Sequence, residues 1–353
     1  MAILQTRDLD SAARQLTAWL VRQLPAGANA EVFDLEIPQG AGHSNETILF
    51  EARWRESGAE RRGGFVARIR PGGRAVFPEY DMQLQYRCMH ILGTRTSIPV
   101  PRVLWFEESA DVLGQPFYVM EKVSGQVPSD NPPYAVVGWL AEASPEDQAE
   151  LWRRSIGVLA RIHQLDWRAL GFDFLDRPQF GATGFEQQLG YYRKYLPWAS
   201  AGSPPPALSE TFAWLEKHRP AESGPVVLNW GDARISNMMY RAFSPVAVLD
   251  WEMACLGPAE VDLAWFIFMN HFLTAAIGIP GLPGFPDRDA TAAEYSAVAG
   301  RPVGDLQYYT VWAAFRFAVI MVAIDTMMVE HGMEAAGAST LALTALASVR
   351  DGE

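Results

Sequence analysis

The sequence predicts an α+β fold with two lobes, a small β-rich N-terminal lobe and a larger helical C-terminal lobe. Apolar and polar residues alternate in several segments before residue 122, and apolar residues recur at helical spacing after residue 144. Between these regions, residues 127–134 are rich in Pro, Ser, Asp and Asn, which is typical of a loop. We therefore expect a lobe over 1–122, a hinge at about 120–126 and a second lobe over 123–353.

The N-terminal lobe is expected to begin with an amphipathic helix. Leu9, Leu16 and Leu20 fall on one helical face, and Pro25 ends the segment. The residues after this helix alternate with period two, which indicates strands with one buried face. The predicted strands lie at 33–37, 48–54, 64–70, 102–107 and 116–121, with one inserted helix at about 82–92.

The C-terminal lobe is expected to be mainly helical. Ser144 and Pro145 have the character of an N-cap and a first helical residue, and Asp147 follows at the third helical position. Leu151, Leu159 and other apolar residues continue that helix on one face. Further helices are predicted at 185–195, at 208–218 and through the apolar C-terminal third, and short strands at 226–228 and 246–249.

Composition and charge exclude some classes of function. The 353 residues are 49% hydrophobic and 20% charged, which is typical of a folded globular chain. The formal net charge of -12 argues against nucleic acid, because phosphate backbones are bound by an excess of Lys and Arg. Such a charge would suit a cationic substrate, although solubility alone also explains it.

The sequence also predicts a cytoplasmic protein without a membrane segment. Cys88 and Cys255 lie far apart and form neither a zinc motif nor a disulfide framework, which favours a reducing compartment. The N-terminus lacks the basic and apolar regions of a signal peptide. The longest apolar stretches, near 265–269 and 317–323, are shorter than a bilayer span.

Two acidic residues and an amide in the second lobe carry the predicted chemistry. Asp232 and Asn237 lie in the segment VVLNWGDARISNMMY, and Asp250 lies in SPVAVLDWEMACLGPAEVDLAW. Phosphoryl transfer requires a carboxylate aimed at the attacking hydroxyl and oxygen ligands that hold Mg²⁺ on the nucleotide phosphates. An Asp–Asn–Asp set on two adjacent strand–loop turns could supply both.

These two segments resemble the catalytic core of the aminoglycoside phosphotransferase family, which shares the protein-kinase-like fold. The resemblance lies in Gly231-Asp232, Asn237, Leu249-Asp250-Trp251-Glu252 and Asp262-Leu263. It implies that Asp232 is the catalytic base and that Asn237 and Asp250 are metal ligands. It further implies that Arg234 faces the γ-phosphate and that Asp262 supports the catalytic loop.

The resemblance extends into the N-terminal lobe and implies a purine nucleotide site, with ATP or GTP and Mg²⁺ as cofactors. A glycine-containing turn lies between two predicted strands, where it would cover the phosphates or form a plain hairpin. Period two places an apolar side chain for adenine and a cation for phosphate on one face of the next strand. The implied nucleotide-binding residues are Gly40, Gly42, Ser44, Asn45, Val66, Arg68, Met120, Glu121 and Val123.

Three features depart from the pattern of the family, namely residue 85, residue 230 and a glycine-containing turn with only two glycines. Arg68 stands where the family usually has Lys or Arg, and Gln85 stands where it usually has Glu, so the ordinary ion pair is lost. Glu79 or Asp81 could replace that carboxylate. Trp230 precedes Gly-Asp in place of the usual histidine, a role it could fill by packing.

The sequence thus predicts a small-molecule kinase that phosphorylates a hydroxyl. Family members act on aminoglycosides, choline-like alcohols, macrolides and hydroxyacyl-CoA, and the Asp-Trp-Glu version of the motif is most similar to kinase-like domains fused to acyl-CoA dehydrogenases. The alternative is a pseudokinase that binds nucleotide without turnover. The acceptor, the choice between ATP and GTP, and the oligomeric state are left open.

Overall fold

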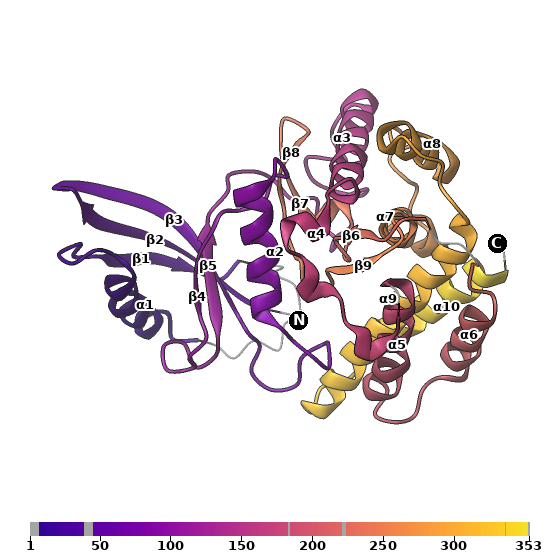
Figure 1. The fold of residues 1–353 in the computed structure, drawn as a ribbon, viewed down its shortest axis with the longest axis horizontal. Coiled ribbons are helices and arrows are strands. Elements are labelled where there is room, and N and C mark those ends of the chain that lie inside the picture. The colour runs from indigo at the N-terminus through magenta and orange to yellow at the C-terminus, as the bar shows by residue number, and fades with distance from the viewer. Residues whose placement is uncertain (1–6, 39–44, 183, 221–223, 336, 352–353) are drawn as a thin grey trace.

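The computed structural model describes residues 7–38, 45–182, 184–220, 224–335 and 337–351. Figure 1 shows a β-rich lobe formed by the first third of the chain and a larger helical lobe formed by the rest. This arrangement confirms the predicted α+β, bilobal fold class. The last strand of the first sheet ends at Glu121, close to the predicted boundary between the lobes.

The N-terminal lobe is a five-stranded antiparallel sheet with strand order β1-β2-β3-β5-β4. Helix α1 lies on one face of the sheet, and α2 lies between the sheet and the helical lobe (Figure 1). All the elements predicted for this lobe are present. Their bounds are α1 Leu9–Gln23, β1 Glu31–Glu36, β2 Glu46–Glu56, β3 Ala59–Ile69, α2 Met82–Arg95, β4 Val103–Glu107 and β5 Phe117–Glu121.

The alternation along β3 separates two hydrophobic cores. Phe65 and Ala67 pack with α1 on one face of the sheet. Val66 belongs to the core on the opposite face, which continues through α2 into the helical lobe. Because side chains two residues apart share a face, Arg68 emerges on the same side as Val66, toward the helical lobe. The strand therefore presents an apolar and a cationic side chain at the junction of the lobes.

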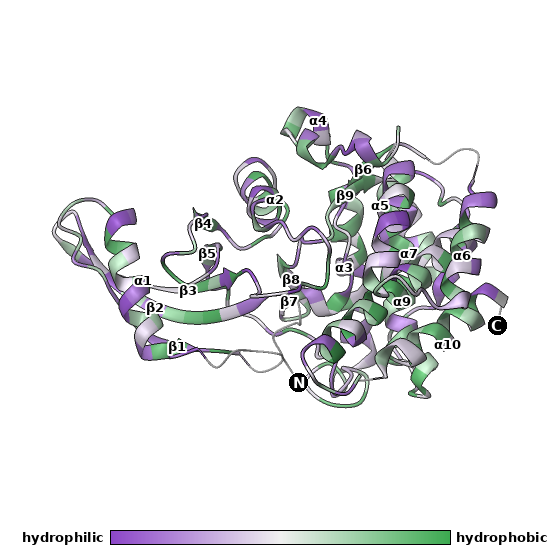
Figure 2. Cartoon of the chain, turned by 90° about the horizontal axis from the view of Figure 1, so that it is seen from below, coloured by the Kyte–Doolittle hydropathy of each residue, from purple (hydrophilic) through white to green (hydrophobic). Residues whose placement is uncertain are grey.

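The C-terminal lobe is built around the long helix α9, which packs against α5, α6, α7 and α10. Its small sheets pair β6 with β9 and β7 with β8. Hydrophilic and hydrophobic bands alternate on peripheral helices such as α6 (Figure 2). The bounds are α3 Pro145–His163, α4 Trp167–Leu170, η1 Asp173–Leu175, η2 Pro178–Phe180, α5 Gly184–Ala199, α6 Pro206–Lys217, β6 Val227–Asn229, η3 Ile235–Asn237, β7 Met238–Arg241, β8 Ser244–Val248, β9 Cys255–Gly257, α7 Glu260–Phe272, η4 Ala275–Ile277, α8 Arg288–Ala299, α9 Leu306–Glu330 and α10 Ala338–Asp351.

The predicted start of α3 is confirmed in detail. The Ser144 hydroxyl accepts a hydrogen bond from the backbone N–H of Asp147 at 3.2 Å, and Pro145 is the first helical residue. This cap satisfies one of the N–H groups that every helix leaves without an internal partner. The cap fixes where the first long helix after the loop begins.

The length of α9 corrects one expectation from the sequence. Its 25 residues are long and apolar enough, by length and composition alone, to cross a membrane, whereas the apolar runs read from the sequence were too short. Within the most apolar window of this helix, 78% of the residues are buried inside the molecule. A helix that is apolar on all sides is also what the centre of a helical lobe requires.

Candidate active site

The loop after β6 carries the predicted base, and one buried carboxylate holds its backbone. Asp262 on α7 accepts hydrogen bonds from the backbone N–H of Trp230 at 2.6 Å and of Gly231 at 2.9 Å. Gly231 has φ +97, and a Cβ there would lie 2.1 Å from the carbonyl oxygen of Met253. Only glycine fits this close approach. His163 contacts the same carboxylate at 3.2 Å and the Tyr295 hydroxyl at 2.7 Å, so it helps to hold Asp262 in place.

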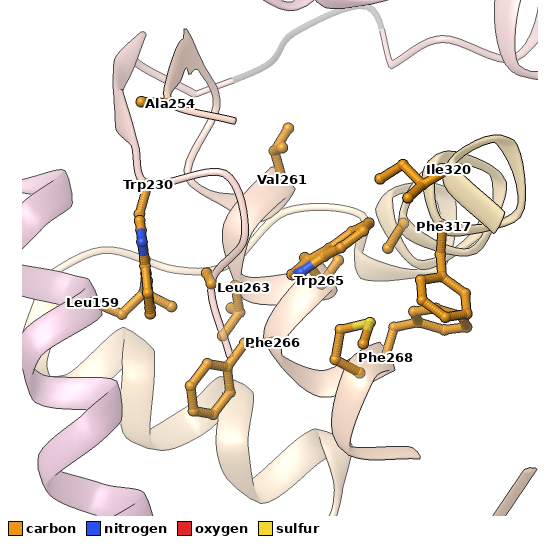
Figure 3. Packing of buried hydrophobic residues seen from close by; sticks show 14 of the residues in the cluster. Leu159, Trp230, Ala254, Val261, Leu263, Trp265, Phe266, Phe268, Phe317 and Ile320 are labelled. Carbon is orange, nitrogen blue, oxygen red and sulfur yellow. The ribbon is translucent and has the colours of Figure 1, made fainter. Parts of the chain in front are cut away.

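Trp230 connects this loop to the segment that carries Asp250. Its indole N–H donates to the Leu249 carbonyl oxygen at 2.7 Å, while the Leu249 N–H donates to the Asn237 carbonyl oxygen at 2.8 Å. The Trp230 side chain is fully buried and lies between Leu159 and Ala254 in Figure 3. Both backbone groups of Leu249 are therefore bound by the preceding loop, which fixes the spacing between Asn237 and Asp250.

The Asp232 carboxylate is held by three donors. The Trp265 indole N–H donates to Oδ1 at 2.8 Å, and Oδ2 accepts from Asn237 Nδ2 at 2.7 Å and from Arg234 Nε at 3.1 Å. Figure 3 shows Trp265 on α7 packed near Phe317 of α9. A carboxylate that accepts several hydrogen bonds is held in one orientation.

Arg234 lies between two carboxylates. Its guanidinium contacts Asp232 through Nε and forms an ion pair with Asp130, which comes from the loop after the first lobe. Burial opposes the charge of Arg234, but Asp232 and Asp130 together raise its pKa above the ordinary value. Arg234 therefore stays charged next to the predicted base. Through Asp130 it also connects the loop between the two lobes to the site.

Asn237 and Asp250 offer oxygen atoms near Asp232. The Asn237 amide nitrogen donates to Asp232, which leaves the amide oxygen as the atom able to bind a cation. Asp250 has φ +58, an uncommon conformation for a residue other than glycine. Its Oδ1 is buried without a hydrogen-bond partner among the described residues. Burial raises the pKa of Asp250, nearby Arg68 opposes this shift, and Asp232 adds to it.

Arg68 pairs with Asp250 rather than with a carboxylate on α2. Its Nη2 lies 3.7 Å from Asp250 Oδ2, and its Nη1 donates to Thr47 Oγ1 at 3.2 Å. Neither Glu79 nor Asp81 forms an ion pair with Arg68 in the described part of the chain, so the suggested replacement of the missing carboxylate was wrong. The two exposed acids lie instead at a cavity beside the N-terminal end of α2.

Gln85 holds two tyrosines by neutral hydrogen bonds. Its side chain is buried, donates to the Tyr80 hydroxyl at 3.2 Å and accepts from the Tyr118 hydroxyl at 3.3 Å. Tyr80 in turn donates to Glu252 Oε2 at 2.8 Å. Gln85 therefore positions two tyrosines and forms no ion pair, and Arg68 contacts Asp250 instead.

The remaining predicted nucleotide residues lie along the junction of the lobes. Val66 and Met120 are opposite each other in the sheet, and both belong to the core that continues into the helical lobe. Glu121 pairs its backbone N–H with the Arg102 carbonyl oxygen at 2.9 Å. Val123 follows in the connecting segment and is half-buried.

The structure describes only the end of the glycine-containing turn. Gly40, Gly42 and Ser44 lie outside the described residues. Asn45 begins the described part and is buried, with its Nδ2 3.4 Å from Glu252 Oε2. The end of the turn thus contacts the segment that carries Asp250.

Sequence reasoning missed two side chains that hold the site. Asp130 was assigned only to a loop, and Trp265 only to an apolar stretch. Trp265 follows Asp262 by three residues, and side chains three apart lie on the same face of a helix. That spacing could have predicted that both residues of α7 face the same loop. The pairing of Asp130 with Arg234 joins segments 104 residues apart and has no local signal.

The comparisons with known proteins agree with this geometry. A family model described as the phosphotransferase enzyme family matches residues 37–301. The match covers most of the chain, including every residue of the Asp232, Asn237 and Asp250 constellation. The chain belongs to the phosphotransferase enzyme family.

Solved structures show the same fold. A putative aminoglycoside phosphotransferase from Ralstonia eutropha superposes with a TM-score of 0.70 at 25% identity, covering 96% of this chain and 98% of that one. An ethanolamine kinase from Plasmodium vivax gives a TM-score of 0.61 at 11% identity, covering 99% and 95%. At such low identity the second likeness is one of fold alone.

The curated relatives are longer proteins. A probable acyl-CoA dehydrogenase from Arabidopsis thaliana is 26% identical over 307 residues, covering 81% of this chain and 35% of the relative. Acyl-CoA dehydrogenase family member 11 from Rattus norvegicus is 28% identical over 254 residues, covering 71% and 30%. The chain spans about a third of the length of the curated relatives it matches.

Proposed function

We propose that this chain transfers the γ-phosphate of ATP or GTP to a hydroxyl group of a small molecule, with Mg²⁺ as the metal. The observation that carries the proposal is the convergence of Asp232, Asn237 and Asp250. Asn237 Nδ2 is 2.7 Å from Asp232 Oδ2, and Asp250 Oδ1 is a buried carboxylate oxygen without a partner among the described residues. A carboxylate beside two oxygen ligands is what phosphoryl transfer requires.

Asp232 acts on the acceptor. The Trp265 indole fixes one carboxylate oxygen, and the other lies beside Asn237, so the carboxylate has one preferred orientation. In this orientation Asp232 accepts a hydrogen bond from the incoming hydroxyl and takes its proton as the hydroxyl oxygen bonds to the γ-phosphorus and the bond from that phosphorus to the leaving nucleoside diphosphate breaks. Arg234 offsets negative charge that gathers next to Asp232.

The oxygen atoms of Asn237 and Asp250 fit a magnesium ion. Mg²⁺ binds oxygen ligands and is commonly held by one or two side chains together with substrate phosphates. The described residues contain no group of three His, Cys, Asp or Glu side chains that could form a metal cage, which agrees with a site completed by phosphate oxygens. When bound, the ion neutralises charge on the phosphates and aligns the γ-phosphate.

Arg68 and the face of β3 support a nucleotide at the junction of the lobes. Val66 supplies an apolar surface for a purine, and Arg68 on the same face supplies a fork of N–H donors for phosphate oxygens. Structural neighbours of the same fold include a GDP complex of aminoglycoside 2'-phosphotransferase-IIIa and a complex of a related enzyme with AMP-PNP and hygromycin B. These complexes support a nucleotide and a small-molecule acceptor here.

A nucleotide-binding module without turnover is the second candidate function. The observation in its favour is Gln85, because a neutral side chain on α2 forms no ion pair with the cation of β3. The Arg68–Asp250 pair gives that cation another anchor. The intact Asp232, Asn237 and Asp250 favour the enzyme.

Replacing the proposed base separates the two candidates. Asp232→Asn should lower phosphoryl transfer by about 10²–10⁴-fold, the usual contribution of general acid–base catalysis, and leave Mg-nucleotide affinity nearly unchanged. The measurement is a screen for phosphate transfer from ATP and GTP over alcohol acceptors, followed by steady-state kinetics of the variant. Asp173→Asn, which changes an exposed aspartate, is the matched control. Turnover at the wild-type rate in Asp232→Asn would sink the assigned role.

A further inference from the structure

A cavity of about 440 Å³ lies beside the catalytic loop, between the two lobes. Its walls come from the start of α2, the end of β4, helices α5 and α9, and the segment from Glu252 to Cys255 that follows Asp250. The volume falls within the usual range for pockets that bind small molecules. Tyr191 and Tyr192 of α5 and Phe174 give the cavity an aromatic wall.

Arg316 of α9 is the buried cation of this wall. Its side chain is only 2% exposed. Nε donates to the Tyr192 hydroxyl at 3.3 Å, Nη2 donates to the Gly231 carbonyl oxygen at 3.2 Å, and Nη1 has no partner among the described residues. A buried N–H donor without a partner is rare, because its lost hydrogen bonds to water are not replaced.

Three acidic side chains around the cavity are exposed, whereas Arg316 is buried. Glu79, Asp81 and Glu108 line the cavity but are exposed, so water screens them. Glu252 is half-buried and accepts a hydrogen bond from Tyr80. Arg316 forms no ion pair with a carboxylate in the described part of the chain.

Asp262 is the carboxylate that acts on the pKa of Arg316, and its oxygens already accept other hydrogen bonds. Burial opposes the charge of Arg316, but Tyr192, Cys255 and Asp262 together raise its pKa. Asp262 uses both of its oxygens on the backbone N–H groups of Trp230 and Gly231. The floor of the cavity therefore includes a buried guanidinium that has one N–H group unpaired, and no ion-paired carboxylate, among the described residues.

We infer that the cavity is the acceptor site and that Arg316 selects an acceptor carrying an anionic oxygen group, a carboxylate or a phosphate, in addition to its hydroxyl. The inference rests on the proposed function and adds the class of substrate. A buried guanidinium binds an anion more strongly than an exposed one, because less water competes for the charge. The aromatic wall suits an apolar portion between the two polar ends.

The position of Arg316 relative to the proposed base supports this assignment. The guanidinium lies 4.7 Å from the centre of the Trp265 ring, and the Trp265 indole donates to Asp232 Oδ1 at 2.8 Å. The residue bound by Nη2, Gly231, directly precedes Asp232. Arg316 thus contacts the residue that precedes Asp232 and the indole that holds it, so an anion anchored on the guanidinium is held close to the proposed base.

Four probes of one chain length test the inference without nucleotide. They are ω-hydroxyhexanoate, its uncharged amide, the corresponding ω-amino alcohol and hexanediol monophosphate, each titrated into the full chain by calorimetry. We expect the two anions to bind about tenfold to a hundredfold more tightly than the amide and the amine, the effect of one charge-assisted hydrogen bond. The two anions, compared with each other, distinguish a carboxylate from a phosphate.

Variants locate the origin of the preference. Arg316→Gln should abolish it, and Arg316→Lys should keep part of it. Arg70→Gln is the matched control, because Arg70 lines the same cavity but is exposed, and it should bind all four probes as the wild type does. Leu84→Trp fills the cavity from the first turn of α2 and should remove anion binding without changing Mg-ATP binding.

The outcomes separate this inference from the proposed function. Equal binding of the amide, a preference for the amine, or an anion preference that survives Arg316→Gln would overturn the inference. If Arg316→Gln fails to fold, retained anion binding in Leu84→Trp overturns it and lost binding supports it. Absence of Mg-ATP binding to the wild type would contradict the proposed function alone, because the probe titrations contain no nucleotide.

Discussion

Arg68 and Gln85 do not form the ion pair that is usual at these two positions, and each makes separate contacts. The arginine contacts Asp250 and Thr47, and the glutamine contacts two tyrosines. A planar guanidinium binds phosphate oxygens at two points, so it depends less on a carboxylate partner than an ammonium does. The substitution at residue 85 removes a charge without leaving the cation unanchored.

The two positions should therefore respond differently to truncation. Arg68→Ala should weaken nucleotide binding by about 1.5–3 kcal/mol, the scale of a hydrogen bond to a charged group. Gln85→Ala should leave nucleotide affinity nearly unchanged but lower the free energy of unfolding by about 1–3 kcal/mol, because the buried Tyr118 hydroxyl loses its acceptor and the Tyr80 hydroxyl keeps only Glu252. Nucleotide titration and urea denaturation measure the two effects. Equal losses of nucleotide affinity would show that Gln85 holds the phosphate site.

The Asp250 carboxylate should lower the unfolding free energy of the chain when no cation is bound to it. Its pKa is raised in the folded chain, mainly by burial, so the folded state keeps the proton to a higher pH than the unfolded state does. The unfolding free energy should therefore fall as pH rises above the ordinary aspartate pKa, through the raised value. Above the raised pKa, the charged carboxylate then destabilises the fold when no cation is bound.

Asp250→Asn should raise the unfolding free energy at pH 7 in the absence of Mg²⁺ and have little effect at about pH 3, below the ordinary aspartate value. Asparagine also tolerates the positive φ found here. Urea denaturation at the two pH values measures the change. A loss of stability at pH 7 would mean that the Arg68 ion pair outweighs the cost of burial.

At the scale of the elements, helix α5 shows how closely the helices around the cavity pack. Gly190 faces η2, and a Cβ there would lie 1.8 Å from the carbonyl oxygen of Phe180. The helix must shift to admit a methyl group, and Tyr191 and Tyr192 would move with it. Two residues of the cavity wall therefore depend on a glycine that makes no contact with a ligand.

Gly190→Ala should lower the unfolding free energy by about 1–3 kcal/mol, the usual cost of overpacking. The matched control is Gly157→Ala in α3, where a Cβ meets no atom within 4 Å. That change should raise stability by about 0.5–1 kcal/mol, because alanine loses less conformational freedom in a helix. Urea denaturation of both variants provides the measurement, and a stabilised Gly190→Ala would contradict the packing described for α5.

Most elements were predictable because their signals are local. The alternation that predicted β3 spans only a few residues of sequence, and so does the cap that predicted the start of α3. Strands β7 and β9 were missed. Strand β9 has only three residues and is defined by its pairing with β6, in the register Asn229↔Cys255. A strand that short is determined by its partner and not by its own pattern.

At the scale of the whole molecule, contacts between the lobes place the site. Residues Gln126 and Tyr240 exchange backbone hydrogen bonds of 2.9 and 2.8 Å, and the Val248 N–H donates to the Pro99 carbonyl oxygen at 2.8 Å. These bonds join the connecting segment and the first lobe to the hairpin of β7 and β8, which lies between Asn237 and Asp250. The orientation of Arg68 toward Asp250 depends on them.

The sequence predicted the parts of the site that share one stretch of chain. Asp232, Asn237 and Asp250 are recognisable because a short hairpin fixes their spacing. Asp130, Trp265 and Arg316 come from distant segments, and their approach depends on how α7 and α9 pack. That packing follows from apolar surfaces that fit one another, and it leaves no motif in the sequence.

The most direct test of the account is a calorimetric titration of ATP and GTP into the wild-type chain and Asp250→Asn, each with and without Mg²⁺. We predict that at least one nucleotide binds the wild type, that Mg²⁺ strengthens the binding, and that Asp250→Asn loses most of this Mg²⁺ effect. The loss should be about tenfold or more, as expected when a charged metal ligand is replaced by a neutral one. Binding that is absent for both nucleotides, or the same with and without Mg²⁺, would contradict the proposed magnesium-dependent phosphotransferase.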